Sequence, residues 1–142
     1  MTDEWKNRLD GFFNEEKEKP GNRDVSEMAA FIKNAAMPAF AEISAELEKH
    51  GRFTDIRTSE TSAAIIVQKD NKEEFTYRLQ SRTFPNGVMP YAEIRFRERG
   101  GLRYITVEAM IRSNTDCSIR DIDSETVVEH FVRHYTSRVE RD

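Results

Sequence analysis

The chain has 142 residues, 34% of them charged and 37% hydrophobic, with a formal net charge of −4 at pH 7. These values are typical of one folded domain and exclude a disordered or fibrous chain. The single cysteine excludes an internal disulfide framework and a cysteine-based zinc site. The charged N-terminus does not resemble a signal peptide, and no apolar run approaches the ~20 residues of a membrane span. We therefore expect a cytoplasmic protein that does not enter the membrane.

Residues 1–22 are predicted to form an N-terminal amphipathic helix or arm. Its apolar residues follow one stripe of a helix, at positions Trp5, Leu9, Phe12 and Phe13. The turn-forming residues Lys19–Asn22 are predicted to end it and to form a linker. The stripe would dock on its own domain or pack on a second subunit. Membrane binding is disfavoured because the segment is acid-rich and has no cationic face.

Residues 23–142 are predicted to form a single α+β domain that begins with a long helix. Asp24, followed by Glu27 three residues later, fits a capping box at the start of this helix. Pro38 lacks the N–H group that an interior helical position needs. The sequence therefore allows either a kinked helix over 24–50 or two helices that meet near Met37.

The apolar period then changes to two, which predicts five strands at 53–58, 62–69, 74–82, 91–99 and 102–112. A three-residue loop at 70–72 would pair Val67 with Phe75, Ile65 with Tyr77 and Ala63 with Leu79. A longer turn is expected over 84–90. Gly100-Gly101 predicts a two-residue hairpin that pairs Phe96 with Ile105, Ile94 with Val107, Arg97 with Tyr104 and Arg95 with Thr106.

A last helix is expected to start near Asp123 or Ser124, either of which can cap it. Its apolar face is predicted to hold Val128, Phe131, Val132, Tyr135 and Val139. Because the strands follow one another through short loops, the predicted fold is α+β. It is a five-stranded antiparallel meander with a long helix before it, a helix after it, and the helices on one face.

The second face of this sheet is the most informative predicted feature. If the apolar residues face the helices, it carries Arg78, Arg82, Tyr91, Arg95, Arg97 and Tyr104. Guanidinium groups bind phosphate or carboxylate, and aromatic rings on a sheet stack with bases. The pattern therefore fits a surface for single-stranded nucleic acid or another anionic ligand. It also fits a solvated face whose arginines pair with Glu74, Glu93 and Glu108, or a face buried in a dimer.

The remaining polar patterns point weakly to chemistry. His130 and His134 lie four apart on the last helix, a spacing that can bind metal, but Phe131 stands where a hydrolytic motif has Glu. Alternating Asp121, Asp123 and Glu125 suggest calcium ligands, although helix capping explains them equally well. Cys117 lies beside an acid, which raises a thiol pKa, so a nucleophile is not expected there. We predict no metal or cofactor.

No phosphate-binding loop, dinucleotide fingerprint or nucleophile-elbow pattern is present in the sequence. The simplest interpretation is a non-enzymatic binding module that forms a homodimer or binds another protein. Its working surface would be the second sheet face or a groove between the sheet and the long helix. Two alternatives stay open: binding of single-stranded nucleic acid or an anionic ligand by the Arg/Tyr face, and an enzyme whose active site is assembled from distant positions.

Overall fold

The computed structural model describes residues 4–9, 20–85, 87–98, 103–112 and 118–139. Residues 4–9 form a short helix. The other elements are α2 (Pro20–Phe31), the π-helical η1 (Ile32–Ala36), α3 (Met37–Glu48), β1 (Phe53–Thr58), β2 (Ala63–Lys69), β3 (Lys72–Phe84), β4 (Gly87–Arg97), β5 (Tyr104–Met110), the 3₁₀-helical η2 (Ile119–Asp121) and α4 (Ser124–Arg138).

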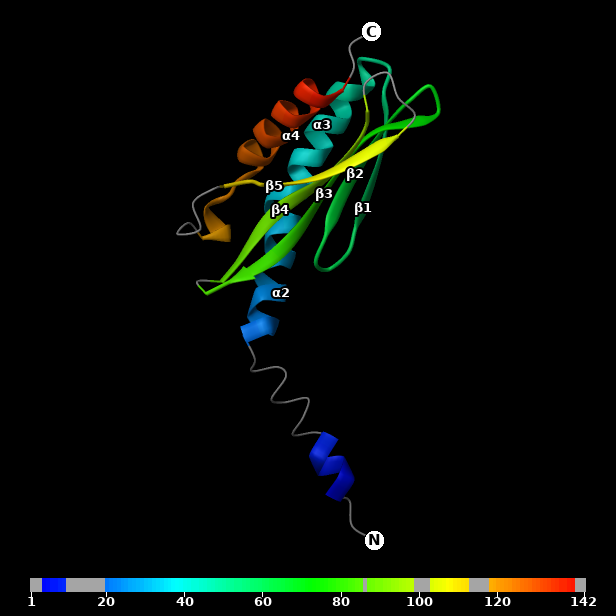
Figure 1. The fold of residues 1–142 in the computed structure, drawn as a ribbon. Helices are drawn as coiled ribbons and strands as arrows, with labels where there is room; N and C mark the ends of the chain where they lie inside the picture. The colour runs from blue at the N-terminus through cyan, green and yellow to red at the C-terminus, as the bar shows by residue number, and fades with distance from the viewer. Residues whose placement is uncertain (1–3, 10–19, 86, 99–102, 113–117, 140–142) are drawn as a thin grey trace.

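The five strands form one antiparallel sheet in the order β1-β2-β3-β4-β5. The long N-terminal helix and α4 lie together on one side of this sheet, and none of the described helices covers its other side (Figure 1). The predicted α+β meander is therefore confirmed.

The long helix starts earlier than the sequence pattern predicts. It begins at Pro20, so the predicted linker is helical from Pro20 onward and Asp24 is not its cap. Proline is well tolerated in the first helical turn, where an N–H group has no partner within the helix. Glu27, the other member of the predicted capping box, lies 3.7 Å from the guanidinium of Arg120 instead.

The helix continues across Pro38 through a π-helical turn. The N–H of Met37 donates to the carbonyl oxygen of Ile32, a bond to the fifth residue back. This wider turn precedes Pro38, which stands in the first turn of α3. In a regular α-helix the proline ring would clash with the carbonyl group four residues back, and the wider π-helical turn before Pro38 lets the chain accommodate the proline without a break. The separation into two helices near Met37 that the sequence allowed does not occur.

The β2–β3 hairpin has the predicted pairs but not the predicted loop. Val67 pairs with Phe75, and the pairs toward the other end of the strands follow as expected. The turn holds only Asp70 and Asn71, both with positive φ (54° and 64°), a conformation typical of two-residue hairpins. The register shifts beside Val67, so Glu74 is an extra residue in a β-bulge on β3. The bulge replaces the third loop residue.

The next hairpin is longer than expected, and the predicted loop over 84–90 is wrong. β3 continues to Phe84, which pairs with Gly87 at the start of β4. Pro90 lies inside β4 and is buried. Because β5 pairs with β4 only from Tyr91 onward, β4 has a free edge at Pro90, where a missing N–H is tolerated.

The predicted β4–β5 register is confirmed. The observed pairs include Phe96 with Ile105, Ile94 with Val107, Arg97 with Tyr104 and Arg95 with Thr106. The backbone N–H of Glu98 donates to the carbonyl of Arg103 at 2.8 Å. The Gly100-Gly101 turn itself lies outside the described residues.

The core lies between the helices and the sheet, and aromatic rings fill its centre. Phe75 and Tyr77 of β3 meet Phe131 of α4 edge to face, at 5.4 and 5.3 Å between ring centroids. The face that α4 buries differs from the prediction, because Val127 and His130 are buried while Val132 is 46% exposed. Because α4 packs against both the long helix and the sheet, the side that it buries includes Val127 and His130 and excludes Val132.

Candidate functional site

All six predicted site residues lie on the sheet face opposite the helices. We call this surface the open face. Buried Tyr77 and Ile94 point toward the helices, so the alternate residues of the same strands point away from them. On the three strands that carry the predicted site, the face comprises Thr76, Arg78, Gln80 and Arg82 of β3, Tyr91, Glu93, Arg95 and Arg97 of β4, and Tyr104, Thr106 and Glu108 of β5.

A first group on the open face is built around Arg82 and Tyr91. The guanidinium carbon of Arg82 lies 4.4 Å from the centre of the Tyr91 ring. Its Nη2 donates to Oε2 of Glu108 at 2.9 Å, and this hydrogen bond raises the pKa of Arg82. The hydroxyl of Tyr91 donates to Oε1 of Gln80 at 2.8 Å. One arginine is thus held by an acid and by a ring at the same time.

A second group repeats this arrangement around Tyr104. Arg95 and Arg97 lie over its ring, at 4.4 and 5.8 Å from the centroid. The Nε of Arg95 lies 3.3 Å from Oε2 of Glu73, and the Tyr104 hydroxyl donates to the Glu73 backbone carbonyl at 3.2 Å. The ring of Tyr104 therefore reaches from β5 across β4 to β3. The sequence predicted the three residues on β4 and β5 but missed Glu73.

Glu74 does not belong to the open face, contrary to prediction. Its carboxylate accepts a hydrogen bond from the Tyr135 hydroxyl and forms an ion pair with Arg52, Nη2 to Oε2 at 3.2 Å. Both partners belong to the helix side of the sheet. The β-bulge explains the difference, because an extra residue reverses the alternation of side chains at that point. Glu73 consequently takes the place on the open face that alternation gives to Glu74.

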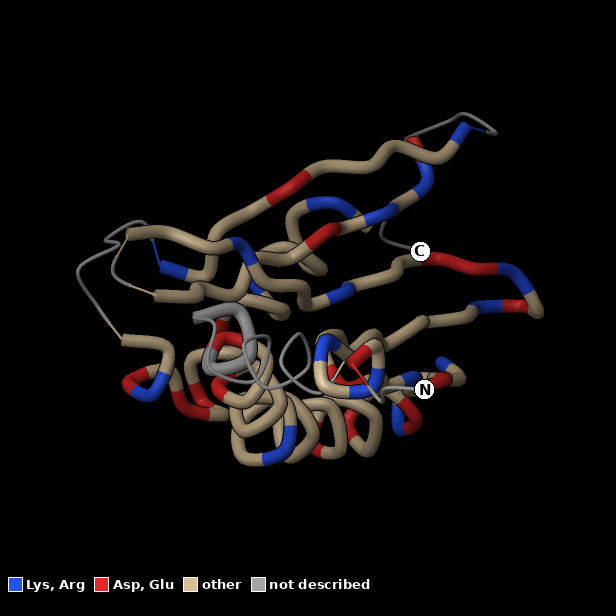
Figure 2. Tube along the Cα trace, turned by 90° about the horizontal axis from the view of Figure 1, so that it is seen from below, with Lys and Arg blue, Asp and Glu red and all other residues tan. Residues whose placement is uncertain are grey.

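The open face is mixed in charge rather than uniformly basic. On β3, β4 and β5 its four arginines share it with three acids, Glu73, Glu93 and Glu108. Glu93 lies directly opposite both Arg78 on β3 and Glu108 on β5. Basic and acidic positions are interspersed along the strands when the molecule is seen from below (Figure 2). The face therefore presents fixed pairs of opposite charge.

His130 lies in the core, on the side of α4 that faces the sheet. It is 2% exposed. Its Nδ1 lies 2.7 Å from the Tyr77 hydroxyl and its Nε2 lies 3.1 Å from the Met110 carbonyl. Burial lowers its pKa to about 4, and the charges of His134 and Arg133 act in the same direction. At neutral pH, Nε2–H donates to Met110 and Nδ1 accepts from Tyr77.

The pair of histidines that could have bound metal serves this packing instead. The rings of His130 and His134 lie 4.6 Å apart between centroids. The Nδ1 of His134 accepts a hydrogen bond from Nε of Arg138 at 3.3 Å. Among the residues that the structure describes, no group of three or more His, Cys, Asp or Glu is arranged to hold a metal ion.

The acids before α4 cap helices. Asp123 is the N-cap of α4 and accepts from the backbone N–H of Thr126 at 2.9 Å. Asp121 and Ser118 form a capping box around η2. These bonds support the capping interpretation of the acidic run over the calcium interpretation. Cys117 lies outside the described residues.

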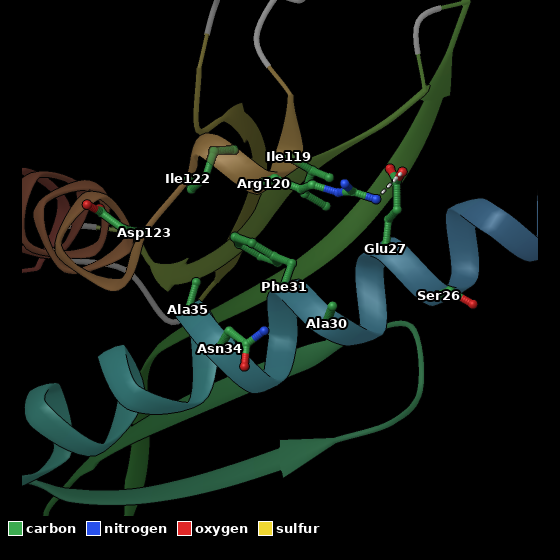
Figure 3. Close-up of a pocket in the computed structure, with 10 residues that line it drawn as sticks. All are labelled: Ser26, Glu27, Ala30, Phe31, Asn34, Ala35, Ile119, Arg120, Ile122 and Asp123. Atoms are coloured by element: carbon green, nitrogen blue, oxygen red, sulfur yellow. Dashed lines mark ion pairs between the residues drawn. The ribbon is translucent and has the colours of Figure 1, made fainter.

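A pocket lies at the N-terminal end of the long helix, between α2–η1 and the segment 119–123. Its volume is about 440 Å³. Figure 3 shows Phe31 and Ala35 on the helix side of this pocket and Ile119 and Ile122 on the other side. Its polar residues are Ser26, Glu27, Asn34, Arg120 and Asp123. The sequence predicted a groove between the sheet and the long helix, and this pocket instead lies between two helical segments.

Comparison with known proteins adds no relative: no family model, curated protein or solved structure matches this chain. Within the described residues, no helix is both long enough and apolar enough to cross a membrane.

Proposed function

We propose that this chain is a non-enzymatic binding module that works as a homodimer and binds a partner protein with the open face of its sheet. The observation that carries the proposal is the stacked arrangement of arginine and tyrosine on a face that no helix covers in the part of the chain that the structure describes. Tyr and Arg are enriched in protein interfaces and among the residues that dominate their binding energy. Because Arg82 and Arg95 are each held by an acid and a ring, a partner that covers them costs little side-chain entropy.

The charges on this face favour a protein partner over nucleic acid. A surface for single-stranded nucleic acid needs cations free for phosphates and rings free for bases. Here Glu108 and Glu73 neutralise Arg82 and Arg95, and a guanidinium covers one side of both tyrosine rings. A face that carries both acidic and basic groups instead complements a protein surface with the opposite arrangement of charges. It disfavours surfaces that would place like charges together.

The buried polar groups support a binding role better than a catalytic one. The two ring nitrogens of His130 are both engaged, by Tyr77 and by Met110, and the ring is closed off from solvent. Glu74 is similarly engaged by Arg52 and Tyr135. A general acid or base must reach a substrate proton, which these groups cannot do without leaving their partners.

Photo-crosslinking inside cells tests the use of the open face. A photoreactive phenylalanine analogue replaces Thr106, which is exposed on this face, or Ala41, which is exposed on α3. We expect the Thr106 probe to capture one protein species that the Ala41 probe does not, and Tyr104→Ala to abolish the capture. Equal labelling by both probes would overturn the proposal.

A direct titration separates the nucleic-acid alternative. A fluorescent 20-mer of deoxythymidine is added to the purified protein at increasing salt concentration. We expect no binding at physiological ionic strength. Four phosphate contacts on a single strand give a slope of about −3 in a plot of log binding constant against log salt concentration. Binding with this slope that Arg95→Ala weakens would show that the open face binds nucleic acid and not a protein.

A further inference from the structure

The helix at the N-terminal end of the chain exposes two large apolar side chains. Trp5 is 57% exposed and Leu9 is 48% exposed. They lie four residues apart in the helical segment 4–9, so they share one side of it. An indole and an isobutyl group left in water forfeit several kcal/mol of burial, and such pairs commonly mark an interaction site.

The pocket beside α2 has the complementary character. It is lined by Ala30, Phe31, Ala35, Ile119 and Ile122, with polar groups around them. Its volume of about 440 Å³ exceeds that of a tryptophan side chain and is in the range of pockets that hold compact ligands. The ion pair between Glu27 and Arg120 spans it with a separation of 3.7 Å (Figure 3).

Charge and chain length also match. Segment 4–9 carries one acid and two bases, whereas the polar rim carries two acids, Glu27 and Asp123, and one base, Arg120. Residues 10–19 join Leu9 to the start of α2, and ten residues can span up to about 33–36 Å. Ser26, the pocket residue nearest to the start of α2, is six residues into that helix, or about 9 Å along its axis.

We infer that two copies of this chain associate by exchanging their N-terminal helices, with Trp5 and Leu9 of each copy occupying the pocket of the other. In the single chain Trp5 and Leu9 are exposed, and the pocket stays open to the helix of a second copy. The inference rests on the homodimer proposed above and names its contact. Such exchange is isologous and closes with two copies, and it leaves the open face available for a partner.

The test combines mass with fluorescence, because Trp5 is the only tryptophan of the chain. Sedimentation equilibrium measures the dimer dissociation constant, and Trp5 emission is recorded over the same concentrations. We expect the emission maximum to move to shorter wavelength as dimer forms. Because each substitution alters both symmetric contacts of the dimer, Trp5→Ala and Ala30→Arg are each expected to raise the dissociation constant by at least about thirtyfold, the effect of losing a single aromatic anchor from its pocket.

Matched variants serve as controls. Ala30 and Ala41 are both exposed alanines of the long helix, but only Ala30 lines the pocket. Ala41→Arg therefore makes the same substitution away from the pocket and is expected to leave the dissociation constant unchanged. Tyr104→Ala, on the open face, is also expected to leave it unchanged.

Each other outcome contradicts a specific statement. A dimer that survives Trp5→Ala and Ala30→Arg but is lost in Tyr104→Ala overturns the exchange and keeps the homodimer. A monomer whose Trp5 emission is already shifted at every concentration shows self-docking and overturns both the exchange and the homodimer. A monomer with fully exposed Trp5 emission also overturns both.

Discussion

Protonation of His130 is expected to destabilise the fold as the pH falls. In the folded protein its pKa is lowered from 6.5 to about 4, first by burial and then by the nearby charges of His134 and Arg133. The unfolded chain therefore binds more protons than the folded chain between these two pH values. The stability contributed by neutral His130 is fully present above about pH 6.5 and is lost as the pH falls toward 4.

The two pKa values give the size of the effect. Between about pH 7.5 and 5, a shift from 6.5 to about 4 removes about 2 kcal/mol from the free energy of unfolding. Because His130 is 2% exposed, solvent screening reduces this figure only modestly. Chemical denaturation at a series of pH values measures it directly. Above pH 5, most carboxylates stay ionised and contribute little to the difference.

Two variants decide whether His130 is responsible. His130→Gln keeps an amide donor for the Met110 carbonyl but cannot titrate, so it is expected to lose most of the pH dependence while lowering stability uniformly. His134→Gln, four residues further along the same helix, is expected to keep most of it. An unchanged pH dependence in His130→Gln would refute the reasoning, as would its complete loss in His134→Gln.

Three further predictions concern stability, each measured by denaturant unfolding. Glu74→Gln removes the carboxylate that pairs with the Arg52 guanidinium, in a site where both side chains are largely buried. The free energy of unfolding should fall by about 2–3 kcal/mol, and a fall below about 0.5 kcal/mol would contradict this. Asn71 has φ of 64°, so Asn71→Gly should be nearly neutral whereas Asn71→Val should cost about 1–2 kcal/mol; equal effects would argue against the two-residue turn. Phe131→Ala should cost about 3–5 kcal/mol but Val132→Ala less than about 1 kcal/mol, since Phe131 is 1% and Val132 46% exposed; the reverse order would mean that α4 packs with a different face.

The sheet was largely predictable because hairpin register is a local property. Pairs such as Phe96 with Ile105 follow from the short connection and from the need to keep apolar residues on one face. The same alternation assigned six arginine and tyrosine residues to the open face. It did not reveal that Arg82, Arg95 and Arg97 lie over the two tyrosine rings, because these contacts join side chains of three strands that meet only after pairing.

The errors occur where an element depends on distant contacts. A bulge and a two-residue turn give the same pairs as a three-residue loop, so the pattern could not show that Glu74 turns toward the helices. Its partners are distant in the sequence: Arg52 lies just before β1, and Tyr135 lies in α4. The buried side of α4 was predicted wrongly for a similar reason. A polar histidine is expected on the surface, and His130 can be buried only because Tyr77 and Met110 form hydrogen bonds with it.

The sequence by itself determined the fold class, the side-chain pairs of the β2–β3 and β4–β5 hairpins and the six arginine and tyrosine residues of the open face, because these follow from periodicity and short connections. Only the tertiary structure decided which charges are paired, which histidine is buried, and that α2 and the segment 119–123 enclose a pocket. Those features arise where residues far apart in the chain meet. The pattern of residue types along the chain does not show which distant residues come into contact. The packing of the helices on the sheet determines those contacts.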